Sequence, residues 1–200
     1  DAAVRRVRDG RIPPEAAIDD PPWHAYVPLR QATLPIAGTA AARRTNSFHY
    51  VIDVAAGVQQ PEGDFVEVAR SPQLTNPASG VLATLDLAAV AALIPGGVAG
   101  PPVRDDSLRG APDRFAFTVR LRVFDDTGQF AEDRRTLHLH DDPDLLSGFP
   151  LRLTSDGASP PLPADLDGDG TEELLLGTSD GQVHAFRLDG TELPGWPVHT

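Results

Sequence analysis

The chain has 200 residues, enough for one or two domains, and its 29 acidic against 17 basic residues give a formal net charge of −12. This charge makes nucleic acid and anionic membranes unfavourable partners, because both carry phosphate groups that an acidic surface repels. The absence of cysteine excludes disulfides, thiolate metal sites and a cysteine nucleophile. The longest apolar stretch, Leu82 to Val98, is interrupted by Asp86 and Pro95, so we expect no membrane insertion.

Residues 1–22 predict a short N-terminal helix and a linker. Ala2, Ala3, Val4 and Val7 recur at helical spacing, Gly10 favours the end of a helix, and Pro13-Pro14 prevents it from resuming. A helix of about two turns is marginal in water on its own. We therefore expect it to close a domain that lies upstream.

Residues 23–142 predict a β-sandwich of the immunoglobulin or fibronectin kind. Apolar residues alternate with other residues over 48–54 and, most clearly, over 115–123. A turn at 125–128 follows the second run, and 136–140 leads the chain back as a hairpin partner. The apolar segment 86–94 predicts one short helix.

Residues 143–200 contain an internal repeat. Gly148-Phe149-Pro150 returns 47 residues later as Gly195-Trp196-Pro197, a period typical of propeller blades. We place the first repeat at 148–194 and the start of a second at 195. A single blade cannot bury both of its faces, so further blades are expected downstream and the chain is expected to be part of a longer protein.

The loop 165–173 is the motif with the most specific chemistry. Carboxylates stand at alternate positions of this loop, so they can converge on a hard cation. Calcium accepts a mixture of carboxylate, carbonyl and water oxygens as ligands. The expected ligands are Asp165, Asp167, Asp169, the backbone carbonyl of Thr171 and Glu173. The loop differs from an EF-hand, whose closing Glu stands at the twelfth position between two helices. The alternative is a solvated Asp/Gly turn that binds nothing.

Residues 148–200 resemble an FG-GAP repeat, the calcium-loop propeller blade also found in integrin α-chains. The resemblance rests on the loop 165–173, the hairpin turn 179–181, the strand 183–186, and Asp189-Gly190 leading into Gly195-Trp196-Pro197. It implies the first blade of a truncated β-propeller with a structural Ca²⁺. The whole chain is then a mainly β fragment of a secreted or cell-surface bacterial protein.

Residues 1–16 resemble the C-terminal end of a subtilisin-like serine protease domain followed by an accessory β-sandwich. The resemblance implies that any catalytic triad lies upstream, so we expect no catalytic residue in this chain. The first hypothesis is a non-catalytic accessory region of a secreted protease. The alternative is an adhesin-like surface protein with no enzymatic domain, whose protein or glycan ligand the sequence does not identify.

Three further patterns have simpler interpretations. Gly177 to Gly181 match the G-x-S-x-G elbow of hydrolases, but strands on both sides predict a hairpin turn around Ser179. A second candidate metal site lies on one strand and the linker after it: His138, His140, Asp141, Asp142 and Asp144. We prefer the simpler interpretation that these residues form an exposed strand edge that leads into an acidic linker. One strand carries a basic strip, which we expect to be a solvated face paired with carboxylates: Arg114, Arg120 and Arg122. We expect Trp196 to pack between two propeller blades.

Overall fold

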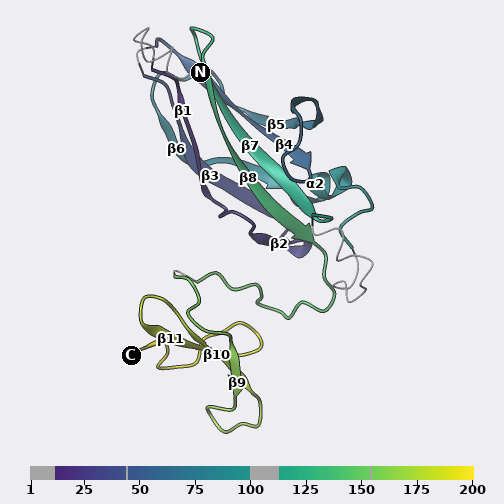
Figure 1. Cartoon of the computed structure of the whole chain (residues 1–200), viewed down its shortest axis with the longest axis vertical. Helices are drawn as coiled ribbons and strands as arrows, with labels where there is room; N and C mark the ends of the chain where they lie inside the picture. The colour runs from purple at the N-terminus through teal and green to yellow at the C-terminus, as the bar shows by residue number, and fades with distance from the viewer. Residues whose placement is uncertain (1–11, 44, 100–112, 154) are drawn as a thin grey trace. The chain divides into compact units, whose positions relative to one another are not determined.

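The structure is a computed structural model that describes residues 12–43, 45–99, 113–153 and 155–200. The chain divides into two compact units, the first ending at Asp142 and the second running from Pro143 to Thr200 (Figure 1). The helix expected near the N-terminus falls on residues 1–11, outside the described residues.

The first unit is mainly β and consists of two open sheets. One has the order β1-β3-β6, and the other the order β2-β8-β7-β4-β5. All neighbours are antiparallel except β2 and β8, which are parallel. The strands are β1 (Glu15–Asp20), β2 (Tyr26–Pro28), β3 (Thr33–Ala41), β4 (Phe48–Ala56), β5 (Val66–Arg70), β6 (Ala78–Asp86), β7 (Ala116–Asp125) and β8 (Phe130–His140).

The two sheets share one hydrophobic core. Leu34 and Ile36 of β3 contribute from the smaller sheet, and Ile52 of β4 and Val119 and Leu121 of β7 from the larger one. Because successive strand residues point to opposite faces, the alternating runs 48–54 and 115–123 each direct one apolar face into this core. The predicted strands at these runs are confirmed as β4 and β7, and the arrangement is compatible with a β-sandwich.

The start of this unit differs from the sequence-based prediction. Residues 15–20, which we expected in a linker, form β1 and pair with β3 from Glu15↔Ala41 onward. Ile18 is only 1% exposed, so β1 is part of the core rather than a connection to it. Two prolines prevent a helix at this point, but they leave the following residues free to form a strand.

The described residues of the first unit also form three short helical elements. They are the 3₁₀ turns η1 (Leu29–Gln31) and η2 (Glu62–Asp64) and the helix α2 (Leu87–Leu93), which confirms the helix predicted over 86–94. The Asp86 carboxylate accepts hydrogen bonds from the N–H groups of Ala88 and Ala89 and so caps α2. The buried side chains Leu87 and Val90 attach the helix to the core.

The second unit is a four-stranded antiparallel sheet in the order β12-β11-β10-β9. Its strands are β9 (Leu162–Ala164), β10 (Glu173–Gly177), β11 (Gln182–Phe186) and β12 (Val198–His199). β12 lies within the residues that we expected to open a second repeat, yet it pairs with β11 of the same sheet.

The two copies of the internal repeat have the same conformation at their glycines but different surroundings. Gly148 and Gly195 have φ of 84° and 89°, a region that favours glycine. A Cβ on Gly148 would lie 1.8 Å from the carbonyl oxygen of Asp189, whereas a Cβ on Gly195 would meet no atom within 4 Å. The chain at Gly148 therefore packs directly on the Asp189-Gly190 turn.

Candidate metal centre

The loop between β9 and β10 is folded by hydrogen bonds from its own backbone to its carboxylates. The N–H groups of Gly168 and Gly170 donate to the two oxygens of Asp165, at 2.7 and 3.1 Å. Both glycines have positive φ, 78° and 88°, which a residue with a side chain rarely adopts. The D-x-D-G-D-G pattern therefore sets the curvature of the loop.

This curvature brings three carboxylates together. Asp165, Asp167 and Glu173 each offer an oxygen, and these oxygens all lie within 4.8 Å of one another. The two aspartates are exposed, but Glu173, the first residue of β10, is 1% exposed. Its Oε2 accepts a hydrogen bond from the N–H of Leu166 at 3.0 Å. The group thus has a buried end on the sheet and an open end on the loop.

The residues present fit a hard divalent cation. Two oxygens that bind one calcium ion at 2.3–2.6 Å lie at most about 5 Å apart, so the observed spacing is compatible with a shared ion. All three side chains are oxygen donors, the type that Ca²⁺ and Mg²⁺ prefer. Asp169 lies outside this group, and its carboxylate accepts the N–H of Thr171 at 2.7 Å.

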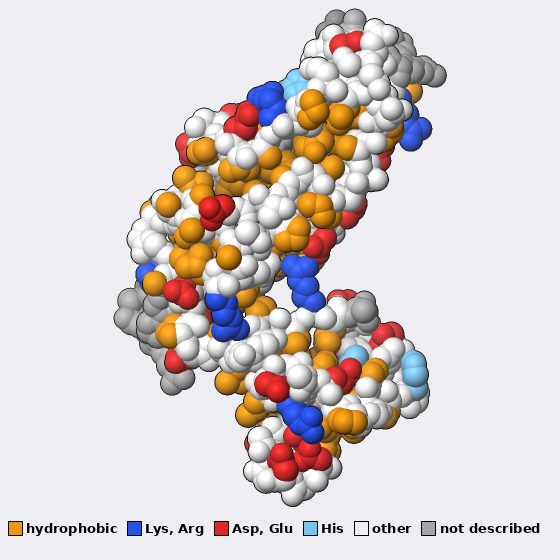
Figure 2. Space-filling model, turned by 180° about the vertical axis from the view of Figure 1, so that it is seen from behind, with side chains coloured by type: hydrophobic (Ala, Val, Ile, Leu, Met, Phe, Trp, Pro, Cys, Tyr) orange, Lys and Arg blue, Asp and Glu red, His pale blue; other side chains and the backbone are white. Residues whose placement is uncertain are grey.

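Arg187 is a neighbour of this group that the sequence analysis did not single out. Its Nη2 lies 3.0 Å from Oδ2 of Asp167. The hydrogen bond with Asp167 raises the pKa of Arg187, and the charges of Asp167, Glu173 and Asp189 act in the same direction. Figure 2 shows the acidic side chains of this loop, with a basic side chain beside them, at the bottom of the view. The group therefore already contains one internal counter-charge.

Ser179 lies in a hairpin rather than in a nucleophile elbow. It stands between β10 and β11, its N–H donates to the carbonyl of Asp156, and its Oγ is 2.7 Å from Oγ of Ser155. The histidine of the same sheet, His184, is hydrogen-bonded through Nδ1 to Glu192 at 2.7 Å. Among the described residues no histidine is hydrogen-bonded to Ser179.

The histidines of β8 pack against rings. His138 stacks on His24, with ring centroids 5.7 Å apart, and His140 stacks on Phe115 at 4.1 Å. Burial lowers the pKa of His138, the nearby His24 lowers it further, and Asp113 opposes them. In the described part of the chain, the one group of three or more candidate ligands is that of the 165–173 loop.

The prediction for the arginines of β7 is confirmed in one part and wrong in another: they pair with carboxylates as expected, but Arg120 lies on a covered face rather than a solvated one. Arg120 is 1% exposed, and its Nε and Nη2 donate to Oδ2 of the buried Asp53 at 3.1 and 3.0 Å. Its Nη1 donates to Glu62 at 2.8 Å, and its guanidinium lies 3.8 Å from the ring centroid of Phe65. The segment around η2 therefore closes over this part of β7.

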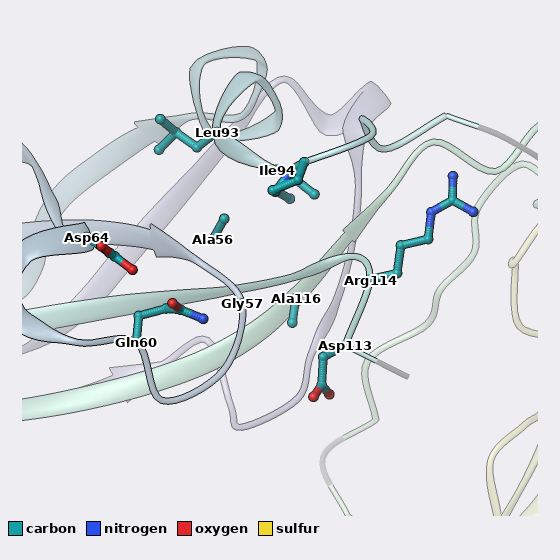
Figure 3. Close-up of a pocket in the computed structure, with 10 residues that line it drawn as sticks. Ala56, Gly57, Gln60, Asp64, Leu93, Ile94, Asp113, Arg114 and Ala116 are labelled. Carbon is teal, nitrogen blue, oxygen red and sulfur yellow. The ribbon is translucent and has the colours of Figure 1, made fainter. Parts of the chain in front are cut away.

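The first unit also contains a pocket of about 620 Å³ beside the C-terminal end of α2 (Figure 3). Leu93 and Ile94 line it from α2 and the residue that follows, and Gln60 and Asp64 lie across from them. The side chains of Asp113 and Arg114 point away from Gln60 and Asp64. The ionisable groups among its described lining residues do not converge, so these residues form no acid–base pair.

No protein-family model, curated protein or solved structure matches this chain. Within the described residues, no helix has both the length and the apolar character that crossing a bilayer requires. A function must therefore be argued from the residues themselves.

Proposed function

We propose that this chain is a non-catalytic, calcium-stabilised binding or accessory region of a larger secreted bacterial protein. The observation that supports the calcium site is the convergence of Asp165, Asp167 and Glu173 within 4.8 Å, with Glu173 buried at the start of β10. Without a cation these carboxylates repel one another, and one arginine, Arg187, offsets only part of that charge.

Calcium is the ion that we favour over magnesium. The loop can add the Asp169 carboxylate and the Thr171 carbonyl to the three converging side chains, and calcium accepts six to eight oxygens in flexible geometry. Magnesium requires a nearly ideal octahedron and keeps several waters. A bound calcium ion supplies charge neutralisation, and the side chains of the loop hold it against β10. Its role in this proposal is structural.

The finer fold assignment is part of the same proposal: an immunoglobulin- or fibronectin-like sandwich followed by the first blade of an FG-GAP-like propeller. Four antiparallel strands in consecutive order support the blade. Apolar side chains of the second unit are also exposed and are available to pack against a further blade: Leu162, Leu166, Leu188 and Val198.

The larger protein is proposed to be a subtilisin-like protease, with an adhesin-like surface protein as the alternative. The first hypothesis rests on the resemblance of residues 1–16 alone, and residues 1–11 lie outside the described part of the chain. In either case the ligand is proposed to be a protein or a glycan. Hydrolysis of casein by this chain itself would contradict the non-catalytic assignment.

The calcium proposal is tested on the full chain by calorimetry and by thermal unfolding of the second unit, followed by Trp196 fluorescence in a Trp23→Phe background. With a dissociation constant of about 10⁻⁴ M, millimolar calcium adds about 1–2 kcal/mol. For a unit of this size, that raises the melting temperature by about 5–10 °C. Asp167→Asn should abolish the shift, whereas Asp156→Asn, a matched change outside the loop, should retain it. Identical melting in calcium and in chelator, with no heat of binding, would refute the site.

A further inference from the structure

The two sheets of the first unit are linked by side chains on one side. On the other side a groove lies between them beside α2, and one side-chain hydrogen bond, from the Tyr50 hydroxyl to the Leu82 carbonyl at 3.0 Å, also joins the sheets there. On the side of β1 and β8, the N–H of Ile18 donates to Asp133 at 2.8 Å, and the guanidinium of Arg135 donates to the Ile18 carbonyl. On the other side, β5 and β6 are the end strands of their sheets, and residues of both line the groove. The open side therefore presents two strand edges.

The groove between these edges is apolar and has a volume of about 340 Å³. Val66 and Val68 of β5 form one wall, and Leu85 of β6 with Val90 and Leu93 of α2 form the other. Val66 and Val68 are 48% and 43% exposed, although they belong to a strand of a core-forming sheet. Ordering an apolar chain in this groove would remove their surface from water.

The backbone of β5 determines what shape of ligand the groove accepts. β5 pairs with β4, and within the described residues no strand pairs with its other edge. Val66 and Val68 are two residues apart and both line the groove, while Glu67 between them pairs with Arg70. An extended peptide can hydrogen-bond to this edge and direct every second side chain into the groove, as in β-strand addition.

The charge beside the groove indicates which charge a ligand should carry. Asp86, whose carboxylate also caps α2, is the one charged residue among the described residues that line the groove. In the described part of the chain the Asp86 carboxylate forms no ion pair, whereas Glu67 and Arg70 of β5 neutralise each other. The remaining charge is negative, and so is the net charge of the chain. A basic ligand is favoured, and a second copy of this acidic chain is disfavoured.

We propose that the β5 edge binds an extended segment of a partner protein as an additional strand. The segment carries apolar side chains at alternate positions and lysine or arginine at its ends. This interaction surface is independent of the calcium site and extends the binding role proposed above to a second place on the molecule.

The test uses the full chain and a fluorescein-labelled, end-capped peptide KVTVTVK, with binding followed by anisotropy. The control peptide KVTPTVK lacks one backbone donor and should bind at least about tenfold more weakly, because proline cannot complete the strand ladder. The acidic peptide EVTVTVE should also bind more weakly, and added salt should reduce the difference between it and KVTVTVK.

Variants of the chain place the interaction at the groove. Val68→Lys introduces a charge into the groove and should weaken binding by about tenfold or more. Val81→Lys makes the same change at a residue of β6 that is 62% exposed and does not line the groove, and it should leave binding unchanged. Circular dichroism verifies that both variants are folded. The proposal is overturned if KVTVTVK does not bind by millimolar concentration, if KVTPTVK binds equally well, or if the chain dimerises through β5 and excludes the peptide.

Discussion

Asp53 is the residue whose replacement most directly tests the buried charge network of the first unit. It is 2% exposed, and its Oδ2 accepts hydrogen bonds from Nε and Nη2 of Arg120 and from Nε of Arg122, at 3.1, 3.0 and 2.9 Å. Asp53→Asn keeps the shape of the side chain but removes its charge. Arg120 would then remain buried, with Glu62 as its carboxylate partner.

The size of the effect follows from this burial. Removing one partner of a buried ion pair costs about 3–5 kcal/mol, because the remaining charge has lost its compensation. Glu62 is still available to Arg120, so we expect a loss of about 3 kcal/mol, or about 10 °C in melting temperature. The matched control is Glu67→Gln, which breaks an exposed pair with Arg70 and should cost far less, because solvent screens exposed ion pairs.

The assay is urea unfolding followed by far-ultraviolet circular dichroism and by tryptophan fluorescence. The chain has two tryptophans, and in a Trp196→Phe background Trp23 alone reports on the first unit. A loss in Asp53→Asn no larger than that in Glu67→Gln would refute the conclusion that the Asp53 charge balances a buried cation.

Two further predictions concern a histidine and a glycine. Burial and the nearby His24 lower the pKa of His138, so its contribution to stability is complete above its ordinary pKa of 6.5 and is lost as the pH falls through the folded-state pKa. His138→Gln should therefore flatten the decline of the unfolding free energy below about pH 6.5, and an unchanged decline would contradict this. Gly148→Ala places a Cβ 1.8 Å from the Asp189 carbonyl oxygen and should lower the melting temperature of the second unit far more than Gly195→Ala, which has a similar φ but open space. Equal losses in the two glycine variants would contradict the packing argument.

The strands that could be predicted are those whose pattern is local. Residues 48–54 and 115–123 alternate clearly and form β4 and β7. β1 was missed because its residues Glu15–Asp20 contain a single large apolar side chain, Ile18, and its burial depends on pairing with β3. The alternation of β7 indicated that Arg120 lies on the face opposite the apolar residues. It could not show that Phe65 and Glu62 cover that face, because a covering loop is a tertiary feature.

The same distinction applies to the candidate site. The spacing of Asp165, Asp167 and Glu173 is local, and the structure brings these three side chains together. Arg187 could be found only from the hairpin register. The pairing Leu174↔Phe186 places position 187 beside position 173, where an arginine can reach Asp167. The sequence contains this signal once the 179–181 turn is used to align the two strands.

The two units differ in how much apolar surface stabilises them, and this difference gives the calcium proposal a physical reason. The first unit surrounds a core that draws large side chains from both sheets and from α2. In the described part of the second unit, the buried apolar residues are Ala185, Phe186 and Leu193, and Glu173 is buried with them. A small sheet with so little core usually needs a metal, a cross-link or a further packing surface. A cation bound by Glu173 would compensate the most deeply buried charge of the sheet and would add stability where the core adds little.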